Sequence, residues 1–217
     1  MKFVQKIFYR IKHVGFLRTC WYLLGTCFLE KIGIHIVRTY QLSNDVNKTK
    51  LQIALLNWDK EFAFGNLLTL EDFTVNDRTA LNDYDPALLQ ESGFPAWLIK
   101  GMDCTIARNQ EKILACLCWG IKTEHRIFPK ELQACYLIQR CNTLPLFRGR
   151  GTYPATLIWT SFCIRSKYPD LPILIESSVF NHSSIRGIEK AMFRQLGYRL
   201  SFTMKFFQKT YYWRSPK

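Results

Sequence analysis

The chain has 217 residues, of which 48% are hydrophobic and 15% aromatic, and its formal net charge is +13. A chain of this length and composition can bury a core, which excludes a wholly disordered protein. It contains no uninterrupted apolar run of about eighteen residues, so we expect no membrane-spanning helix. Lys6, Arg10 and Lys12 interrupt the first apolar stretch, which therefore lacks the pattern of a cleaved signal peptide.

The first part of the chain, residues 1–40, begins with apolar side chains at helical spacing and basic side chains between them. This pattern predicts a basic amphipathic helix. Two interpretations stay open: the apolar stripe packs on the rest of the chain, or it lies on an anionic membrane surface. The polar stretch Gln41–Lys50 indicates a boundary, so we predict an N-terminal extension over residues 1–45 and one domain over residues 46–217.

Strand and helix patterns follow this boundary. The apolar run Leu51–Trp58 predicts a first strand, and the acidic stretch Asp59–Glu91 predicts two helices. Three strands are predicted next, at Cys104–Arg108, Ile113–Ile121 and Leu132–Thr143, and a short polar connection joins the first two as a hairpin.

The last third of the chain begins with a predicted helix at Thr152–Ser166. A short buried strand at Ile173–Ser177 follows, and then a helix that starts at Asn181 and ends at Arg194 or continues to Gly197. Two closing strands are predicted at Arg199–Phe207 and Thr210–Trp213. The order of these elements predicts an α/β fold with a mixed sheet.

The positive charge is concentrated at the two ends of the chain. Lys and Arg outnumber Asp and Glu by seven to one in residues 1–40 and by eighteen to seven in residues 103–217, whereas residues 41–102 carry five against nine. The net values are +6, +11 and −4, which sum to +13. A basic C-terminal part fits a nucleotide phosphate, an acidic carrier protein, an anionic membrane or nucleic acid, and charge alone leaves these open.

The turn between the strand Leu132–Thr143 and the following helix is the candidate phosphate site. Gly149 and Gly151 allow a sharp turn and a close approach of the backbone to a ligand, and Arg148 and Arg150 add positive charge. The helix that follows presents unpaired N–H groups and the positive end of its dipole at the same place. A basic turn by itself is commonly only solvated surface, so its context decides its meaning.

Two ordered blocks of sequence supply that context. Pro145–Gly151 reads Pro-Leu-Phe-Arg-Gly-Arg-Gly, and Asn181–Ser184 is followed by Glu-Lys-Ala-Met-Phe at Glu189–Phe193. Both blocks resemble the signatures of the GNAT superfamily of N-acetyltransferases and other acyl-CoA N-acyltransferases, over roughly residues 100–209. The resemblance implies the GNAT fold, a central mixed β-sheet flanked by helices, with acetyl-CoA as the acyl donor.

The resemblance also implies which residues contact the donor. Backbone groups of Cys141, Asn142 and Thr143 would bind the pantetheine arm, where an N–H group would stabilise the oxyanion of the intermediate. The remaining donor contacts carried over from the family motifs are Arg148, Gly149, Arg150, Gly151, Thr152, Tyr153, Asn181 and Ser184.

A general base would have to take the proton of the acceptor. The candidates are Glu131, Tyr136, Glu124, His125 and Glu176. Glu176 stands out because a carboxylate near the end of a short apolar strand is costly without a partner, although an ion pair with an arginine explains it equally well. His125 lies in a polar stretch and reads as a surface residue.

The chain departs from the family pattern at two positions. Tyr153 stands where relatives often have Gly or Ala, and Ile188 stands where many relatives have a Tyr that protonates the leaving thiolate. Tyr153 is therefore also a candidate catalytic residue. Ser184, solvent or the acceptor itself are the alternatives for this proton.

The eight cysteines lie mostly in apolar segments, and we interpret them as reduced core residues of a cytoplasmic protein. Cys116 and Cys118 lie two residues apart, without a clustered His or a Cys-x-x-Cys pattern, so we predict no metal site.

The sequence therefore predicts an acyltransferase, most simply an N-acetyltransferase, that acts on an amine or hydroxyl of a small, sugar-linked or lipid-linked acceptor. One alternative keeps the enzyme but takes the acyl group from acyl carrier protein or from long-chain acyl-CoA. Another is a non-catalytic CoA-binding module. Nucleic acid is disfavoured because no helix-turn-helix, zinc-finger or RRM pattern is present. We expect a cytoplasmic protein, with a peripheral position at the inner membrane face as an open alternative.

Overall fold

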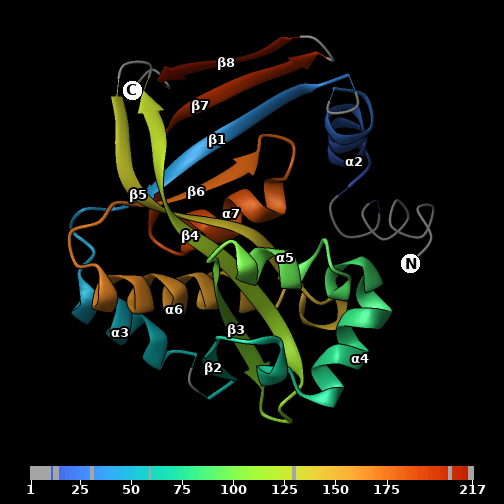
Figure 1. The fold of residues 1–217 in the computed structure, drawn as a ribbon, viewed down its shortest axis with the longest axis vertical. Helices are drawn as coiled ribbons and strands as arrows, with labels where there is room; N and C mark the ends of the chain where they lie inside the picture. The colour runs from blue at the N-terminus through green and yellow to red at the C-terminus, as the bar shows by residue number, and fades with distance from the viewer. Residues whose placement is uncertain are drawn as a thin grey trace.

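The computed structural model describes residues 11, 15–29, 32–58, 60–128, 131–204 and 207–214 (Figure 1). Most of the predicted amphipathic stretch before residue 15 lies outside these residues. Of the residues that follow it, Phe16–Leu23 form the helix α2, and Leu24–Leu29 continue it as a wider, π-helical turn.

A single eight-stranded sheet organises the molecule, in the order β2-β3-β4-β5-β6-β1-β7-β8. Its strands are β1 (Ile34–Leu42), β2 (Phe62–Leu67), β3 (Asp103–Asn109), β4 (Leu114–Phe128), β5 (Glu131–Thr143), β6 (Ile173–Ser178), β7 (Phe193–Met204) and β8 (Phe207–Arg214). Only β5 and β6 pair in parallel, and the other neighbours are antiparallel. The predicted mixed sheet is therefore confirmed.

Helices cover both faces of this sheet. The helices are α3 (Lys48–Leu56), α4 (Val75–Tyr84), α5 (Phe94–Ile99), α6 (Thr152–Lys167) and α7 (His182–Lys190), with short 3-10 turns at Leu70–Asp72, Pro86–Leu89 and Pro145–Phe147. The helix α6 packs on β3, β4 and β5 with α3 beside it (Figure 1). Below, the α6 face means this side of the sheet, and the α5 face means the opposite side.

The alternation of strand side chains explains this division. On β4, Trp119 is fully buried on the α5 face, where its ring lies 5.0 Å from the Phe94 ring and 5.3 Å from the Trp97 ring. Its neighbour Cys118 points to the other side, where Thr105 of the adjacent strand meets Thr160 of α6. Apolar burial of large aromatic rings of this kind is a main source of stability.

The hairpin of β4 and β5 curves away from α6 until β4 contacts β8 (Figure 1). The sheet is thereby partly closed upon itself on the α5 face. Residues from strands that are far apart in the sheet order can therefore meet across the curved surface.

The strand β1 shows that the N-terminal part of the chain contributes to this sheet. It lies between β6 and β7 and is antiparallel to both, with Thr39 opposite Glu176 on one side and Gly197 on the other. Ile34–Leu42 thus lies inside the sheet, although the predicted boundary places it in the extension over residues 1–45. Where an independent unit begins stays a prediction.

The predicted strand at Leu51–Trp58 is wrong, because the helix α3 occupies this stretch. Asn47 caps the helix by accepting a hydrogen bond from the Lys50 N–H at 2.9 Å. Leu51 and Leu55, four residues apart, are its buried side chains. The apolar run has helical spacing, and the capping residue that marks the start of the helix lies four residues before it.

The end of α7 also differs from both predicted positions. The helix ends at Lys190, and Met192 adopts a positive φ of 67° before β7 begins at Phe193. Gly197 lies within β7 and terminates no helix. The other predicted strands are present with shifted ends, of which the largest are the end of β4 at Phe128 and the start of β7 at Phe193. Within Asp59–Glu91, where two helices were predicted, α4 is the one described α-helix, and β1, β2 and α5 were not predicted.

Candidate active site

The parallel strands β5 and β6 separate to form a V-shaped opening. Their pairing covers only Tyr136 to Ile138 of β5 against Ile173 to Ile175 of β6. Beyond this point β5 continues to Thr143 and β6 to Ser178. Backbone groups of β5 in the opening are therefore placed to bind an extended ligand, as a further strand would.

An irregularity in β5 lies directly beyond the apex of this opening. The register of β4 and β5 shifts between Leu117 and Trp119, and Arg140 adopts a positive φ of 51°. Such a bulge adds a residue to one strand and redirects its backbone and side chains. Cys141 and Asn142 follow it, so the predicted backbone contacts of Cys141, Asn142 and Thr143 all lie along the opening.

The turn after β5 directs a helix N-terminus towards the same place. Gly149 and Gly151 have positive φ values of 79° and 77°, and α6 begins at Thr152. Among the described residues, no hydrogen bond is formed by the N–H groups of residues 149–151. Free N–H groups at a helix N-terminus are the usual protein ligands of a phosphate, so this turn fits a pyrophosphate.

The two glycines of the turn have different surroundings. A Cβ at Gly149 would meet no atom within 4 Å, so the backbone there is open to a ligand. A Cβ at Gly151 would lie 2.2 Å from the ring of Trp58. The expectation that both glycines keep the backbone accessible to a ligand therefore needs a correction, because the Cα of Gly151 faces the protein and packs against Trp58.

The two arginines of the turn also differ. Arg148 donates from Nε to the Thr143 carbonyl oxygen at 3.1 Å, and its guanidinium lies over the Tyr84 ring at 5.6 Å. It therefore joins the turn to β5 and α4. Arg150 is exposed, and its only described contact is with the Phe147 ring at 6.0 Å. Arg150 is the more available positive charge for a phosphate.

The arrangement resembles several solved structures. An acetyltransferase from Novosphingobium aromaticivorans assigned to the GNAT family aligns with 76% of this chain and 61% of its own, with 15% identity and a TM-score of 0.47. A Staphylococcus epidermidis protein of unknown function aligns with 78% of this chain and 62% of its own, with 8% identity and a TM-score of 0.50. An aminoglycoside N-acetyltransferase in complex with CoA aligns with 75% of this chain and 90% of its own, with 14% identity and a TM-score of 0.42.

In the arrangement of its elements, the chain is similar to these structures. The chain spans about three fifths of the length of the first two structures. No family sequence model and no curated protein sequence matches it. Identities this low concern the fold and not the reaction, so the chemistry has to be argued from the residues of this chain.

The helix α7 contacts α6 through Tyr153. The Tyr153 hydroxyl lies 3.2 Å from Ser184 Oγ, and the ring lies against Gly187, where a Cβ would come within 2.4 Å of it. Burial raises the pKa of the Tyr153 phenol well above its ordinary value. Tyr153 is therefore a protonated hydroxyl held between the two helices that follow the opening.

The other residues of the second sequence block have structural partners. Asn181 caps α7, and its Oδ1 accepts hydrogen bonds from the Ser184 N–H at 3.4 Å and from Ser183 Oγ at 2.9 Å. Ile188 is fully buried in the core. The Tyr153 hydroxyl reaches α7 at Ser184, one helical turn before Ile188. Tyr153 thus brings a phenol to α7 near the position where Ile188 has none.

Glu176 lies one residue beyond the apex of the opening, on the α5 face. Its carboxylate accepts hydrogen bonds from Arg199 Nε at 2.9 Å and Thr39 Oγ1 at 3.1 Å, and His125 Nε2 lies 3.2 Å from Oε1. Burial alone would raise the pKa of Glu176, but the hydrogen bonds from His125 and Arg199 and the Arg199 charge lower it to about 2. Such a carboxylate is a weak base.

His125 was expected at the surface, yet its side chain is only 10% exposed. The curved hairpin carries it onto Glu176 of β6, whose carboxylate is also paired with Arg199 of β7. The structure therefore brings together two of the five base candidates, as a His–Glu pair.

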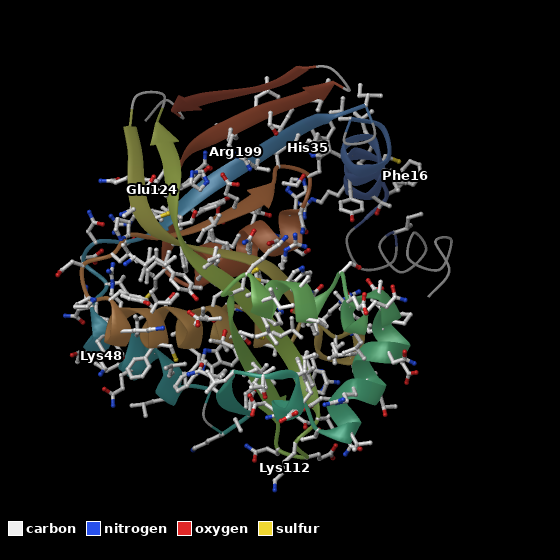
Figure 2. The ribbon with its side chains drawn as sticks, viewed as in Figure 1. Phe16, His35, Lys48, Lys112, Glu124 and Arg199 are labelled. Atoms are coloured by element: carbon white, nitrogen blue, oxygen red, sulfur yellow. The ribbon has the colours of Figure 1, made fainter. Side chains whose placement is uncertain are left out.

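The other base candidates are less suited. Tyr136 is 2% exposed on the α6 face and donates to Asp103 at 2.8 Å; burial and the Asp103 charge raise its pKa. Glu124 is exposed on the outside of the hairpin (Figure 2). Glu131 is the first residue of β5, and its side chain lies outside the described part of the structure.

Three residues near the opening were not singled out from the sequence. Trp58 packs on Gly151, Tyr84 packs on Arg148, and Arg140 lies over Trp97. Each contact joins segments that are far apart in the chain. The positive φ at Arg140 is a property of that residue alone, but an arginine in the sequence does not indicate such a φ.

Proposed function

We propose that the protein is an acyltransferase that moves an acetyl group from acetyl-CoA to an amine or hydroxyl of a small acceptor. The observation that carries this proposal is the V-shaped opening of β5 and β6, which leads directly into the glycine turn and the N-terminus of α6. A slot with free strand groups and an anion site at its end suits a ligand with an extended arm and a pyrophosphate.

The residues of the opening would hold and polarise the donor. Backbone N–H groups of residues 149–151, the α6 dipole and Arg150 would bind the pyrophosphate. Backbone groups of Cys141, Asn142 and Thr143 would bind the arm. An N–H group aimed at the thioester oxygen would stabilise the negative charge that develops during attack.

The His–Glu pair is our candidate for the removal of the acceptor proton. Arg199 and Thr39 keep Glu176 ionised and fixed, so that it orients His125. An imidazole that donates from Nε2 to a carboxylate carries its lone pair on Nδ1, which can take a proton. We therefore assign Glu176 as the positioning residue and His125 as the base.

Tyr153 is our candidate for the protonation of the leaving thiolate. When the acceptor atom bonds to the acyl carbon, the C–S bond breaks and the sulfur gains a pair of electrons. A phenol whose pKa is raised stays protonated at neutral pH and can give its proton to that sulfur. The acceptor proton leaves through His125, so charge and atoms balance.

Binding of the donor is the first test. Acetyl-CoA, CoA and a long-chain acyl-CoA would each be added in a thermal unfolding experiment, where a ligand at a hundred times its Kd adds about 2.7 kcal/mol of stability. Stabilisation by acetyl-CoA and CoA, followed by release of CoA with an amine panel, would support the proposal. Stabilisation without transfer to any acceptor would favour a non-catalytic module. Stabilisation by the long-chain compound alone, or by none of the three, would favour a long-chain or carrier-protein donor.

A peripheral position at an anionic membrane is proposed for the N-terminal part. On α2, Phe16 and Leu17 are 65% and 81% exposed, and Phe16 points away from the sheet (Figure 2). Trp21, half exposed, contacts Phe180 at 5.2 Å, next to the second sequence block. The excess of Lys and Arg over residues 1–40 complements anionic lipid. No described helix is long and apolar enough to cross a bilayer.

Co-sedimentation with vesicles tests this position. The full chain should bind vesicles that contain phosphatidylserine, and the double variant Phe16→Ser, Leu17→Ser should lose most of this binding. Ile99→Ser is the matched control, because Ile99 is 87% exposed on α5. Equal binding of both variants would contradict a membrane contact through α2.

A further inference from the structure

The proposed site has an arginine that neither the donor nor the proton transfers use. Arg140 occupies the bulge of β5, two residues beyond Ile138, where the pairing with β6 ends. At about 3.3 Å per residue, it lies within about 7 Å of the apex along the strand. Its φ of 51° is rare for a residue with a Cβ, and such positions are concentrated at functional sites.

The side chain of Arg140 lies on the α5 face of the opening. Its guanidinium stacks over the Trp97 ring at 4.4 Å, and Trp97 in turn packs against Trp119. Tyr153 and the turn belong to helix α6 on the opposite face. An acceptor that approaches from the α5 face would thus meet Arg140 and the His125–Glu176 pair on the same side of the sheet.

The charge of Arg140 is available for a ligand. It is exposed, and within the described part of the chain no carboxylate lies within salt-bridge distance of it. Other arginines have such partners, for example Arg108 with Asp77 and Arg199 with Glu176. The stacking on Trp97 also orders the guanidinium before any ligand arrives, which lowers the entropy lost on binding.

We propose that Arg140 binds an anionic group of the acceptor, so that the substrates are amines or alcohols that carry a carboxylate or a phosphate. A guanidinium offers two parallel N–H donors that match either oxyanion. Bound there, the acceptor would present its nucleophile to the thioester slot, whose apex is one residue from Glu176. This inference rests on the proposed acyltransferase function and adds the substrate class to it.

Matched pairs of acceptors test the proposal. The protein is first saturated with acetyl-CoA, which occupies the phosphate turn, and release of CoA is then followed. The carboxylate pair is glycine and glycinamide, and the phosphate pair is glucosamine 6-phosphate and glucosamine. With CoA in place of acetyl-CoA, the thermal stabilisation by each compound is measured as a readout of binding alone.

The expected result is that the anionic member of one pair stabilises the CoA-bound protein and is the better acceptor. Which pair responds distinguishes a carboxylate from a phosphate. Arg140→Gly should raise KM for that compound by about 10- to 100-fold and leave the neutral member unchanged. Glycine tolerates the positive φ, so this variant removes the charge without backbone strain. Arg140→Lys should restore part of the binding.

Two controls separate the possible failures. Arg194→Ala removes one exposed charge from β7 and should change neither acceptor constant. Stabilisation of Arg140→Gly by acetyl-CoA should equal that of the unmodified protein. If acetyl-CoA fails to stabilise the unmodified protein, the proposed function itself fails. If acetyl-CoA binds but neither anionic compound stabilises better than its neutral partner, or if Arg140→Gly weakens both members equally, the inference is wrong.

Discussion

The two faces of the opening between β5 and β6 are built in different ways. On the α6 face, the turn, the helix N-terminus and Tyr153 follow one another between Pro145 and Tyr153. On the α5 face, His125, Glu176 and Arg199 come from β4, β6 and β7, which meet only in the folded sheet. The site for the donor is therefore a local feature of the sequence, whereas the proposed site for the acceptor depends on the curvature of the whole sheet.

Gly151→Val is the substitution with the largest expected effect. It tests whether the turn on the α6 face depends only on neighbouring residues or also on the distant residue Trp58. The new side chain would collide with the Trp58 ring, and the residue would have to keep a positive φ of 77°. Overpacking and backbone strain together should lower the free energy of unfolding by roughly 3–5 kcal/mol. Urea unfolding measures this loss. A variant as stable as the parent would show that the Trp58 ring can move away from Gly151 without a loss of stability. The conformation of the turn would then not depend on its contact with Trp58.

Glu176→Gln tests the α5 face. The amide cannot balance the charge of Arg199, whose side chain is 25% exposed, so we expect a loss of about 3 kcal/mol in the free energy of unfolding. Arg199→Met, which removes the other charge, should cost a similar amount. The two changes combined should cost less than their sum, because the double variant removes both members of the ion pair together. Additive losses would argue against a coupled pair.

The pH dependence of this effect has a definite sign. The pKa of Glu176 is lowered from an ordinary value of 4.5 to about 2, so the folded state favours the ionised form. Its contribution to stability is complete above about pH 5 and is lost as the pH falls through the range from about 4.5 to about 2. The difference in unfolding free energy between the parent and Glu176→Gln should therefore shrink below pH 4.5. A difference that stays constant down to pH 3 would contradict the low pKa.

The contrast between the faces also explains what the sequence could predict. The phosphate turn follows from Pro145–Gly151 because a strand, two glycines and a helix start determine its shape locally. The partners of Glu176 could not be predicted, because they depend on β1 lying between β6 and β7. His125 looked like a surface residue for the same reason, since only the curvature of the β4–β5 hairpin buries it.

The errors in secondary structure have a similar origin. Leu51–Trp58 contains enough apolar residues for a buried strand, and only the cap at Asn47 and the four-residue spacing of Leu51 and Leu55 distinguish the helix α3. The end of α7 at Lys190 needs a positive φ at Met192, a residue type that gives no sign of it. These errors did not affect the predicted phosphate turn at Pro145–Gly151, because its glycines and the start of the following helix can be recognised from the neighbouring sequence.

Tyr153→Phe tests the contact between α6 and α7 on the α6 face. The ring would keep its contact with Gly187, and only the hydroxyl near Ser184 Oγ would be lost. If this hydroxyl protonates the thiolate, kcat should fall by about 100-fold with unchanged stabilisation by acetyl-CoA. Ser184→Ala, which leaves the phenol in place, should reduce kcat far less. A loss of stability of about 1 kcal/mol with an unchanged kcat would instead mean that the hydroxyl serves only as a hydrogen bond between helices.

Gly149→Ala has the smallest expected effect on stability and separates binding from folding on the α6 face. The methyl group would meet no protein atom within 4 Å, so only the positive φ of 79° opposes the change, at a cost of about 1 kcal/mol. For a chain of this size, that loss lowers Tm by about 2–4 °C. The open space at Gly149 is where the phosphate should lie, so acetyl-CoA should stabilise the variant much less than the parent. An undiminished shift with acetyl-CoA would mean that the donor does not approach this side of the turn, and Arg150 together with the first turn of α6 would then have to carry the anion.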